Sequence, residues 1–372
     1  MFYFQDPNLA TSPTLHEILL ANVKNANSGG GAYAFASVGG VKLLLRDKDF
    51  QDYLEDNEFH LIIGTDSITS EEAIVELQAI QNKYRTLKIN GYLNPNSQGS
   101  LFHPKFSWFE FDDGRGKLII GSGNMTVKGL RQNKEAIGEI ELDSTTLNQF
   151  KNEWFKWIEE NDSNLYPIDS LEVLDRVKLN DFKYMDKIAS FKSKTDKDIK
   201  DVLNIDLEMT EEDDTSPWNR ALDDEVLICE IPKGGSRWSQ ANFSKYIFEE
   251  YFGATAGVNS GYRILIRNQN SNGDLKEIES RPSVSVKSKN FRFELDAAKG
   301  KKYPTGKKKP IAIFLKVGVR MFKYCLLMPG DPYYTECNSF LDKFPREGTR
   351  VKRRIVKSVL LLNECGELPI LK

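Results

Sequence analysis

The chain has 372 residues, of which 40% are hydrophobic and 28% are charged. This composition is typical of a globular protein, and the length predicts two domains. No apolar run approaches the roughly 20 residues that a membrane helix needs. The N-terminal residues lack the basic start and the apolar run of a signal peptide. The sequence thus argues against membrane proteins and against a membrane partner.

The cysteines bear on the cellular compartment. Cys229, Cys325, Cys337 and Cys365 are far apart in the sequence and form no CxxC pair. This pattern predicts free thiols in a reducing cytoplasm, and it speaks against a cysteine zinc site.

In chain order, residues 1–165 predict an α/β domain with a mixed sheet flanked by helices. A glycine patch, SGGGAYAFAS, leads into an apolar strand. Further strands are predicted over 60–67 and 87–93, around His103 and Lys105, and over 117–120 and 135–142. Ser70 is the expected cap of the third helix. Helical spacing of apolar residues predicts helices over 13–25, 41–54, 70–84 and 147–161.

The middle of the chain changes in composition. Residues 165–200 have a helical pattern of mixed charge. Residues 201–225 hold ten acids and one base, which indicates a solvated linker, and 166–225 is therefore the predicted helical segment and acidic linker. Residues 226–372 predict a mostly β domain, a small antiparallel barrel or sandwich, with one amphipathic helix over 240–252.

Charge is divided unevenly along the chain. Residues 226–372 carry 27 basic and 14 acidic residues, a net of +13, whereas residues 1–225 carry 24 and 40, a net of −16. The positive charge gathers in KGKKYPTGKKKP (299–310) and VKRRIVK (351–357). A basic module attached to an acidic one predicts a polyanionic partner, most often nucleic acid.

One stretch carries residues suited to phosphoryl chemistry. In a strand His103 and Lys105 project to the same side, and the next strand ends in a GSGN turn that contains Ser122 and Asn124. A neutral histidine attacks phosphorus, while a lysine and turn amides hold the negative oxygens. Glu135, eleven residues after Asn124, is placed to orient the ring. The set predicts phosphoryl transfer without a metal.

These residues resemble half of a phospholipase D-type active site, whose pattern is HxK, four residues, Asp, six residues, GSxN. The chain keeps the histidine, the lysine, the GSxN turn and the later glutamate. It departs in the middle, where Glu110 stands in place of the aspartate and DDGRG lengthens the hairpin by four residues. Glu110 is therefore not assigned a catalytic role.

The chain contains one such motif. His16 and His60, the other two of its three histidines, have no lysine two residues on. Members of the family with a single motif are homodimers. The resemblance therefore implies a homodimer in which one His103 forms a phosphohistidine and the other protonates the leaving group, with no metal and no cofactor in this chain.

Residues 226 to about 345 resemble the B3-like DNA-binding domains, a pseudobarrel whose two arms grip the major groove. The arms would be 233–245 and 283–293, which contain side chains suited to base edges and phosphates. The resemblance implies double-stranded DNA as the partner. The predicted DNA-binding residues are Arg237, Ser239, Gln240, Asn242, Lys245, Lys287, Lys289 and Arg292.

A phospholipase D-like domain followed by a B3-like domain is similar to the layout of metal-independent restriction endonucleases of the BfiI type. The resemblance implies a restriction endonuclease, and it leaves open a separate ATPase subunit and a cognate methyltransferase as partners. The chain has no Walker A motif, so any use of ATP and magnesium would come from such a partner. The acidic residues 201–225 are a hypothetical DNA mimic over the catalytic cleft.

Three other functions remain open from the sequence. A lipid-active phospholipase D-type enzyme would need an apolar membrane-facing element, which the sequence does not indicate. A DNA-binding protein with an inactive nuclease half would be expected to have lost part of the motif. A metal-dependent nuclease would need an acidic cluster with a lysine, and no convincing one is found.

Overall fold

A computed structural model describes the chain in two compact units, one of residues 1–6 and 13–217 and one of residues 7–12 and 218–372. The structure describes residues 1–66, 68–94, 101–180, 225–233, 238–254, 262–282, 291–344 and 351–371.

The first unit is built on an eight-stranded mixed sheet with the strand order β1-β7-β6-β5-β2-β3-β4-β8. Strands β2, β3 and β4 are mutually parallel, and the other pairs are antiparallel. The strands are β1 (Phe2–Gln5), β2 (Ala26–Tyr33), β3 (Glu58–Gly64), β4 (Leu87–Tyr92), β5 (Lys105–Phe111), β6 (Gly116–Gly121), β7 (Glu135–Leu142) and β8 (Leu165–Pro167).

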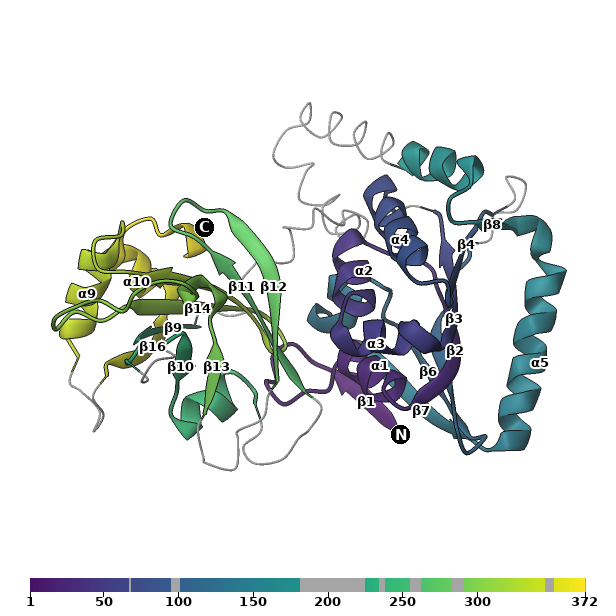
Figure 1. Ribbon diagram of the computed structural model, residues 1–372, viewed down its shortest axis with the longest axis horizontal. Coiled ribbons are helices and arrows are strands. Elements are labelled where there is room, and N and C mark those ends of the chain that lie inside the picture. The colour runs from purple at the N-terminus through teal and green to yellow at the C-terminus, as the bar shows by residue number, and fades with distance from the viewer. Residues whose placement is uncertain are drawn as a thin grey trace, which may run out of the picture. The chain divides into compact units, whose positions relative to one another are not determined.

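Helices lie on both sides of this sheet, so the predicted α/β architecture with a mixed sheet is confirmed. Figure 1 shows α1 to α4 on one side and α5 alone on the other. The helices are α1 (Leu15–Val23), α2 (Val38–Leu45), α3 (Lys48–Asp56), α4 (Glu71–Lys83) and α5 (Ser144–Glu160), with a further helix over residues 171–180.

Local capping explains where these helices begin. The Ser70 side chain accepts from the backbone N–H of Ala73, as the sequence predicts for the start of α4. The single helix predicted over 41–54 is instead two helices. The helical pattern is interrupted at Asp47, which has an extended backbone. Its side chain accepts a hydrogen bond from the N–H of Asp49 and so caps the N-terminus of α3. The local hydrogen bond of the capping side chain therefore starts a new helix, although the apolar pattern continues through this position.

The second unit holds a six-stranded sheet of order β12-β11-β15-β14-β9-β16 and a separate ribbon of β10 and β13. Within the large sheet β11 and β15 are parallel, and the remaining pairs are antiparallel. The strands are β9 (Glu225–Glu230), β10 (Gln240–Asn242), β11 (Arg263–Gln269), β12 (Leu275–Pro282), β13 (Arg292–Glu294), β14 (Ile311–Gly318), β15 (Met321–Leu327) and β16 (Arg353–Lys357).

The predicted mostly β character of this unit is present, but the barrel is not. The strands of the described residues form an open sheet and a ribbon, with no closed barrel among them. The helix predicted over 240–252 is also shorter than expected, because Gln240–Asn242 pair with Arg292–Glu294 as a strand, and helical residues begin at 245. Buried Phe243 and Phe293 pack together beneath the ribbon and account for this pairing.

The C-terminal residues complete the second unit. Strand β16 pairs with β9 at the sheet edge, and α10 (Ser358–Cys365) packs beside α9 (Tyr334–Asp342). Leu361, Cys365 and Ile370 are buried in the same cluster as residues of β9 and β14. The four cysteines of the chain are free and buried.

A short N-terminal segment belongs to the second unit although its neighbours in sequence belong to the first. Residues 7–12 connect β1 to α1, and the buried guanidinium of Arg320 donates to the carbonyl oxygens of Ala10 and Ser12, both at 2.6 Å. Gly253, which has a positive φ of 66°, lies directly against the same segment. No helix in the described ranges is long and apolar enough to cross a membrane.

Candidate active site

The sheet topology brings the predicted catalytic residues together at one end of the strands β5, β6 and β7. Strand β5 begins at Lys105, β6 ends at Gly121 and β7 begins at Glu135. Because β6 is antiparallel to both neighbours, its end lies beside their starts, with Gly121 opposite Ile137 and Ile120 opposite Phe106. Strand β2, the antiparallel neighbour of β5 on its other side, also ends there. Residues separated by up to 32 positions therefore meet where these strands end.

His103 and Lys105 are in direct contact. The Lys105 ammonium lies 2.9 Å from Nε2 and 3.1 Å from Nδ1 of the His103 ring, and 3.4 Å from the His103 carbonyl oxygen. The buried ring of Phe35 packs edge-on against the imidazole, with centroids 5.9 Å apart. His103 is exposed and Lys105 is half-buried. The imidazole is thus accessible and is held between a cation and an aromatic ring.

Burial and a neighbouring positive charge favour the neutral form of the imidazole. Partial burial and the positive charge of Lys105 lower the pKa of His103 below 6.5. Burial also lowers the pKa of Lys105, and the charge of Glu135 acts in the opposite direction. A neutral imidazole has a lone pair for attack on an electrophile. The pair therefore combines a nucleophile with an adjacent cation.

Both oxygens of Glu135 are hydrogen-bonded. Ser122 donates its hydroxyl proton to Oε2, and the Asn133 amide donates to Oε1 at 3.2 Å. The Ser122 oxygen in turn accepts from the backbone N–H of Ala136 at 3.0 Å. Glu135 is buried, being 7% exposed. The carboxylate is thus fixed at the start of β7, and its charge acts on Lys105.

Asn124 lies in the turn after β6 and has an unsatisfied oxygen. Among the described residues no donor reaches its buried Oδ1. The Oδ1 atom is therefore an acceptor that no described protein group uses. The turn is tightly packed, since a Cβ on Gly129 would lie 2.6 Å from the Asn124 nitrogen. Small residues are therefore required there.

Buried polar side chains hold the segment that follows the turn. The amide of Gln5 donates to the carbonyl oxygens of Gly129 at 3.2 Å and Asn133 at 2.9 Å. Arg131, which is fully buried, donates to Nδ1 of His16 at 3.0 Å and pairs with Glu17 at 3.3 Å. The two sets tie β1 and α1 to the loop between Asn124 and Glu135. His16 is consequently a structural histidine.

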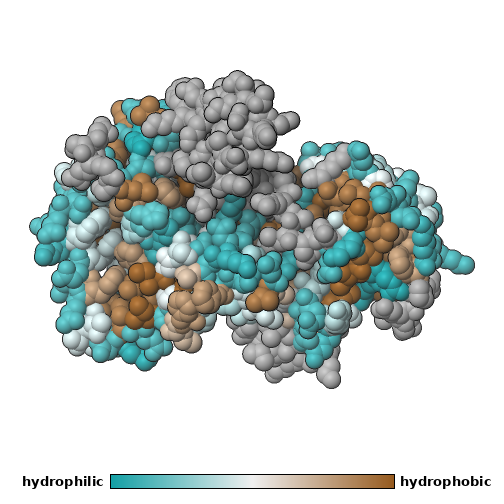
Figure 2. All heavy atoms as spheres, turned by 180° about the vertical axis from the view of Figure 1, so that it is seen from behind, coloured by the Kyte–Doolittle hydropathy of each residue, from teal (hydrophilic) through white to brown (hydrophobic). Residues whose placement is uncertain are grey.

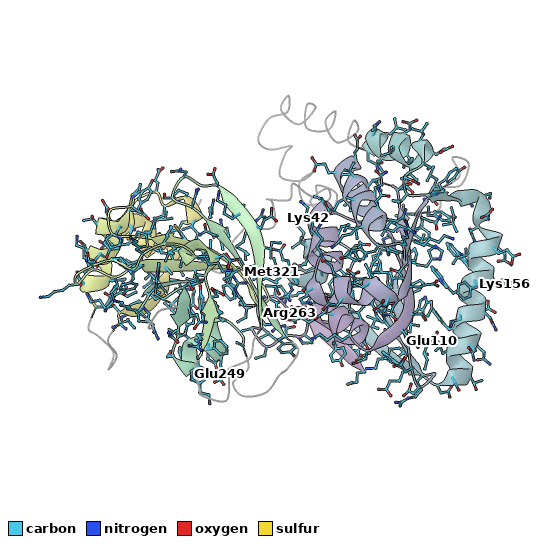
Figure 3. All side chains as sticks on the ribbon, in the orientation of Figure 1. Lys42, Glu110, Lys156, Glu249, Arg263 and Met321 are labelled. Carbon is cyan, nitrogen blue, oxygen red and sulfur yellow. The ribbon has the colours of Figure 1, made fainter. Side chains whose placement is uncertain are left out.

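Glu110 lies away from this edge. It pairs in register with Ser28 of β2 and accepts from the Ser28 hydroxyl at 2.9 Å and from Lys151 of α5 at 2.6 Å. In Figure 3 it lies between the sheet and α5. Five positions along β5 separate it from Lys105, roughly 17 Å at the rise of a strand. Glu110 therefore fastens α5 to the sheet.

Part of the predicted DNA-binding set lies on the β10–β13 ribbon. Asn242 is the register partner of Arg292, and Gln240 is the partner of Glu294. These four alternate with buried Ala241 and Phe293, so they share the polar face of the ribbon. Ser239 donates to Glu294 at 3.3 Å. Exposed Lys245 lies 3.8 Å from Glu249.

The remaining predicted DNA-binding residues, Arg237, Lys287 and Lys289, lie outside the described residues, as does the acidic segment up to residue 224. Several other basic side chains pair within the chain. Lys309 lies 2.9 Å from Glu230, and the Lys308 ammonium lies 5.9 Å from the centre of the Tyr334 ring.

Sequence reasoning missed three site residues. Phe35 contacts His103 from a loop distant in sequence, Asn133 donates to the nearby Glu135, and Glu294 stands opposite Gln240, a predicted DNA-reading residue. Neither Phe35 nor Glu294 belongs to a sequence pattern that would have pointed to the site. Asn133 stands two residues before Glu135, a position that a search for amide donors beside the carboxylate would have found. In the described ranges no three His, Cys, Asp or Glu side chains are grouped as metal ligands.

No protein-family model and no curated protein matches the chain. Solved structures similar to it include Nuc from Salmonella typhimurium, a phospholipase D family member, at 14% identity over 45% of this chain and 95% of that chain, with a TM-score of 0.32. NucT from Helicobacter pylori has 14% identity over 40% and 88%, with a TM-score of 0.29. Yeast tyrosyl-DNA phosphodiesterase has 16% identity over 38% and 32%, with a TM-score of 0.28.

Proposed function

We propose that the chain is a restriction endonuclease of the phospholipase D-like type. The first unit would hydrolyse a DNA phosphodiester without a metal, and the second, B3-like unit would bind a specific double-stranded sequence. The observation that carries the proposal is the direct contact of His103 with Lys105 at the sheet edge that also holds Ser122, Asn124 and Glu135.

The chemistry proceeds in two displacements. A ring nitrogen of His103 attacks phosphorus, the P–O bond to the leaving strand breaks, and a phosphohistidine forms. Lys105 and the turn donors stabilise the negative charge that develops on the phosphoryl oxygens. Water then attacks the phosphohistidine and gives a proton to the group that protonated the leaving oxygen, the P–N bond breaks, and free His103 and a phosphate-ended strand are formed.

The leaving oxygen must receive a proton in the first displacement. Lys105 is poorly placed to serve as that acid, because it is needed as a cation beside the phosphoryl group. The other two histidines are engaged elsewhere, His16 with Leu43 at 2.9 Å and His60 with Asn90 at 2.8 Å. The proposal therefore includes a homodimer, in which the partner's His103 is in its imidazolium form while the attacking His103 is neutral, and donates the proton.

DNA recognition is assigned to the second unit. The polar face of the β10–β13 ribbon offers Gln240, Asn242 and Arg292 in adjacent register positions. A two-stranded ribbon fits the major groove, where amide side chains read adenine and arginine reads guanine. Arg237, Lys287 and Lys289 remain proposed contacts from sequence. A methyltransferase and an ATPase remain proposed partners.

The test is cleavage of long mixed-sequence DNA in EDTA, followed by sequencing of the ends. The wild type is compared with His103→Ala and with His60→Gln, a matched change of a histidine away from the site. We expect discrete fragments from the wild type and His60→Gln, none from His103→Ala, and a sequence motif at a fixed offset from the ends.

Other outcomes would favour the alternatives. Cutting that requires a divalent metal and survives His103→Ala would indicate a metal-dependent nuclease. Specific DNA binding without cutting, even with Mg-ATP and cell extract, would indicate a DNA-binding protein with an inactive nuclease half. Hydrolysis of phospholipid vesicles in place of DNA would indicate a lipid-active phosphodiesterase.

A further inference from the structure

The β10–β13 ribbon is held at both ends by arginines of the large sheet. Hydrophilic groups cover most of the surface that Figure 2 shows, with apolar groups gathered in a few places, so polar side chains alone do not distinguish the ribbon. The contacts at its two ends do. The register pairs Gln240 with Glu294 and Asn242 with Arg292, so Asn242 and Glu294 lie at opposite ends of the ribbon. The backbone carbonyl oxygen of each of these two residues accepts from an arginine.

Arg353 holds the end that contains Asn242. Its guanidinium donates to the Asn242 carbonyl oxygen at 2.5 Å. Arg353 is on β16 and is the register partner of Cys229 on β9. Cys229 is buried in the same cluster as Ala241 and Phe293 of the ribbon. Because register partners point to the same face of a sheet, the Arg353 side chain lies on the face against which the ribbon packs.

Arg281 holds the other end. It lies on β12, and its Nε donates to the Glu294 carbonyl oxygen at 2.7 Å. Its guanidinium also pairs with Glu279 at 2.6 Å and with Asp296 at 2.8 Å. Buried Glu279 accepts from the backbone N–H of Asp296 at 2.9 Å, and its other oxygen accepts from the Tyr324 hydroxyl at 2.6 Å. The residues that end β13 are thus tied to both β12 and β15.

The two arginines come from the two edge strands of the large sheet, since β12 and β16 are the first and last strands in its order. In Figure 1, β10 and β13 lie side by side below that sheet. Each strand of the ribbon has three residues. A two-stranded ribbon is marginally stable by itself, so its orientation depends on the groups that hold it. Recognition side chains need such support, because a loosely held set loses its geometry.

Stability alone does not account for an arginine at position 353. The side chain is half-buried, and its Nε is buried with no hydrogen-bond partner among the described residues. A buried, unpaired donor on a charged group costs free energy, and an apolar side chain of similar size would avoid that cost. What Arg353 adds is a directional, charge-assisted hydrogen bond to the ribbon. Arg353 thus fixes geometry at a cost in solvation.

The next residue in the basic VKRRIVK cluster has different surroundings. Side chains alternate between the two faces along a strand. Arg354 is the register partner of Ile228, which is buried in the cluster on the opposite face of the sheet. The Arg354 guanidinium lies 5.4 Å from the centre of the Phe344 ring. Arg354 is therefore a matched control for Arg353, with the same charge on the same strand.

We infer that Arg353 and Arg281 are positioning residues for DNA recognition, which fix the two ends of the β10–β13 ribbon so that the side chains on its polar face meet the bases as one rigid unit. The inference rests on the proposed function, because it takes that polar face as the surface that reads DNA. It gives Arg353 no contact with DNA. A phosphate contact contributes on any sequence and releases counterions, whereas a positioning residue contributes where bases are read.

The experiment measures the affinity of the full chain for DNA by fluorescence anisotropy at several salt concentrations. All variants carry His103→Ala, so that the DNA stays intact, and this parent first selects its site from a random double-stranded library. We expect Arg353→Met to lose at least about tenfold in affinity for the selected duplex and to stay within about twofold on a scrambled one. The slope of log K against log salt should not change. Arg353→Lys, which keeps a donor for the carbonyl oxygen, should recover part of the loss, and Arg354→Met should match the parent on both duplexes.

A second measurement needs no DNA. Peptide-level hydrogen exchange follows the ribbon, because its strands are paired through their backbone groups. We expect Arg353→Met to speed exchange in peptides that cover β10. Arg281→Lys, which keeps a positive charge beside Glu279, should speed exchange in peptides that cover β13. Arg354→Met should change neither. Thermal unfolding of each variant establishes that it is folded.

The outcomes separate this inference from the proposed function. A parent that selects no sequence would overturn the proposed recognition and this inference together. If the parent selects a sequence and Arg353→Met keeps both its affinity for that sequence and its exchange rates, this inference alone fails. Equal losses on the two duplexes, with a salt slope smaller in magnitude by about 0.9, would make Arg353 a phosphate contact and would also overturn it.

Discussion

The Lys105 ammonium lies within 3.1 Å of both ring nitrogens of His103, and its charge adds to the effect of burial in lowering the pKa of the imidazole. We expect His103 to titrate below 6.5, and Lys105→Met to raise its pKa by removing the neighbouring charge, while the part due to burial remains. NMR titration of the three histidines in both proteins checks this. Lys117→Met, on β6 and paired with Glu139, is the control. An unchanged His103 pKa in Lys105→Met would contradict the assignment.

Glu135→Gln keeps the size of the side chain but removes its charge. Glutamine retains an acceptor for Ser122, so the fold should persist, while the pKa of Lys105 loses the influence that raises it. Groups that orient or tune a catalytic residue typically contribute about 10–100-fold. We expect single-turnover DNA cleavage to slow by about that factor. A rate within about twofold of wild type would remove Glu135 from the site.

Glu110→Gln should affect stability and leave the chemistry unchanged. Burial raises the pKa of Glu110, but its hydrogen bonds from Lys151 and Ser28 outweigh this and leave the pKa below its ordinary value. The stabilisation is therefore present above the unfolded pKa and is lost as the pH falls through the folded one. For a pair this exposed we expect about 0.5–1 kcal/mol at neutral pH. Urea unfolding measures it, and a cleavage rate that fell tenfold would argue for a catalytic role.

Arg292→Ala tests the polar face of the β10–β13 ribbon. A bidentate arginine contact to guanine contributes about 1–3 kcal/mol of discrimination. We therefore expect a loss of about 5–150-fold in affinity for the cognate sequence and a smaller loss on random DNA, at matched salt. Lys343→Ala, which removes a lysine paired with Glu364 outside both basic clusters, is the control. Equal losses on both DNAs would reduce Arg292 to a phosphate contact.

Lys323 is buried in β15, and burial lowers its pKa to about 8. Between that value and the unfolded pKa of about 10.4, the unfolded chain binds more protons, so stability from this group rises with pH. Lys323→Met should raise stability at pH 7 by about 1–3 kcal/mol, since an apolar side chain avoids burying a charge. The difference between variant and wild type in urea unfolding should shrink toward pH 10. If the difference in unfolding free energy stayed constant with pH, the burial of a charged Lys323 would not be its cause.

The sequence contained enough to predict the α/β class and most helices of the first unit, and to propose its catalytic residues. Period-3.6 and period-2 patterns are local, and so are capping signals such as Ser70. The spacing of His103 and Lys105 is local as well. Two predictions about secondary structure were wrong, each for a physical reason. Asp47 ended a helix that the apolar pattern continued, and Gln240–Asn242 took a strand conformation because a partner strand some 50 residues away was available.

What the sequence determined by itself was the set of residue types on which the proposed chemistry rests, because the presence of a histidine, a lysine and a carboxylate does not depend on the fold. Only tertiary structure decided which of them meet. Antiparallel pairing of β5, β6 and β7 brought Glu135 to Ser122 and placed Glu110 away from the site, and the β1–β7 register put Phe2 beside Gly138. Such contacts join residues distant in the chain, and no local spacing encodes them.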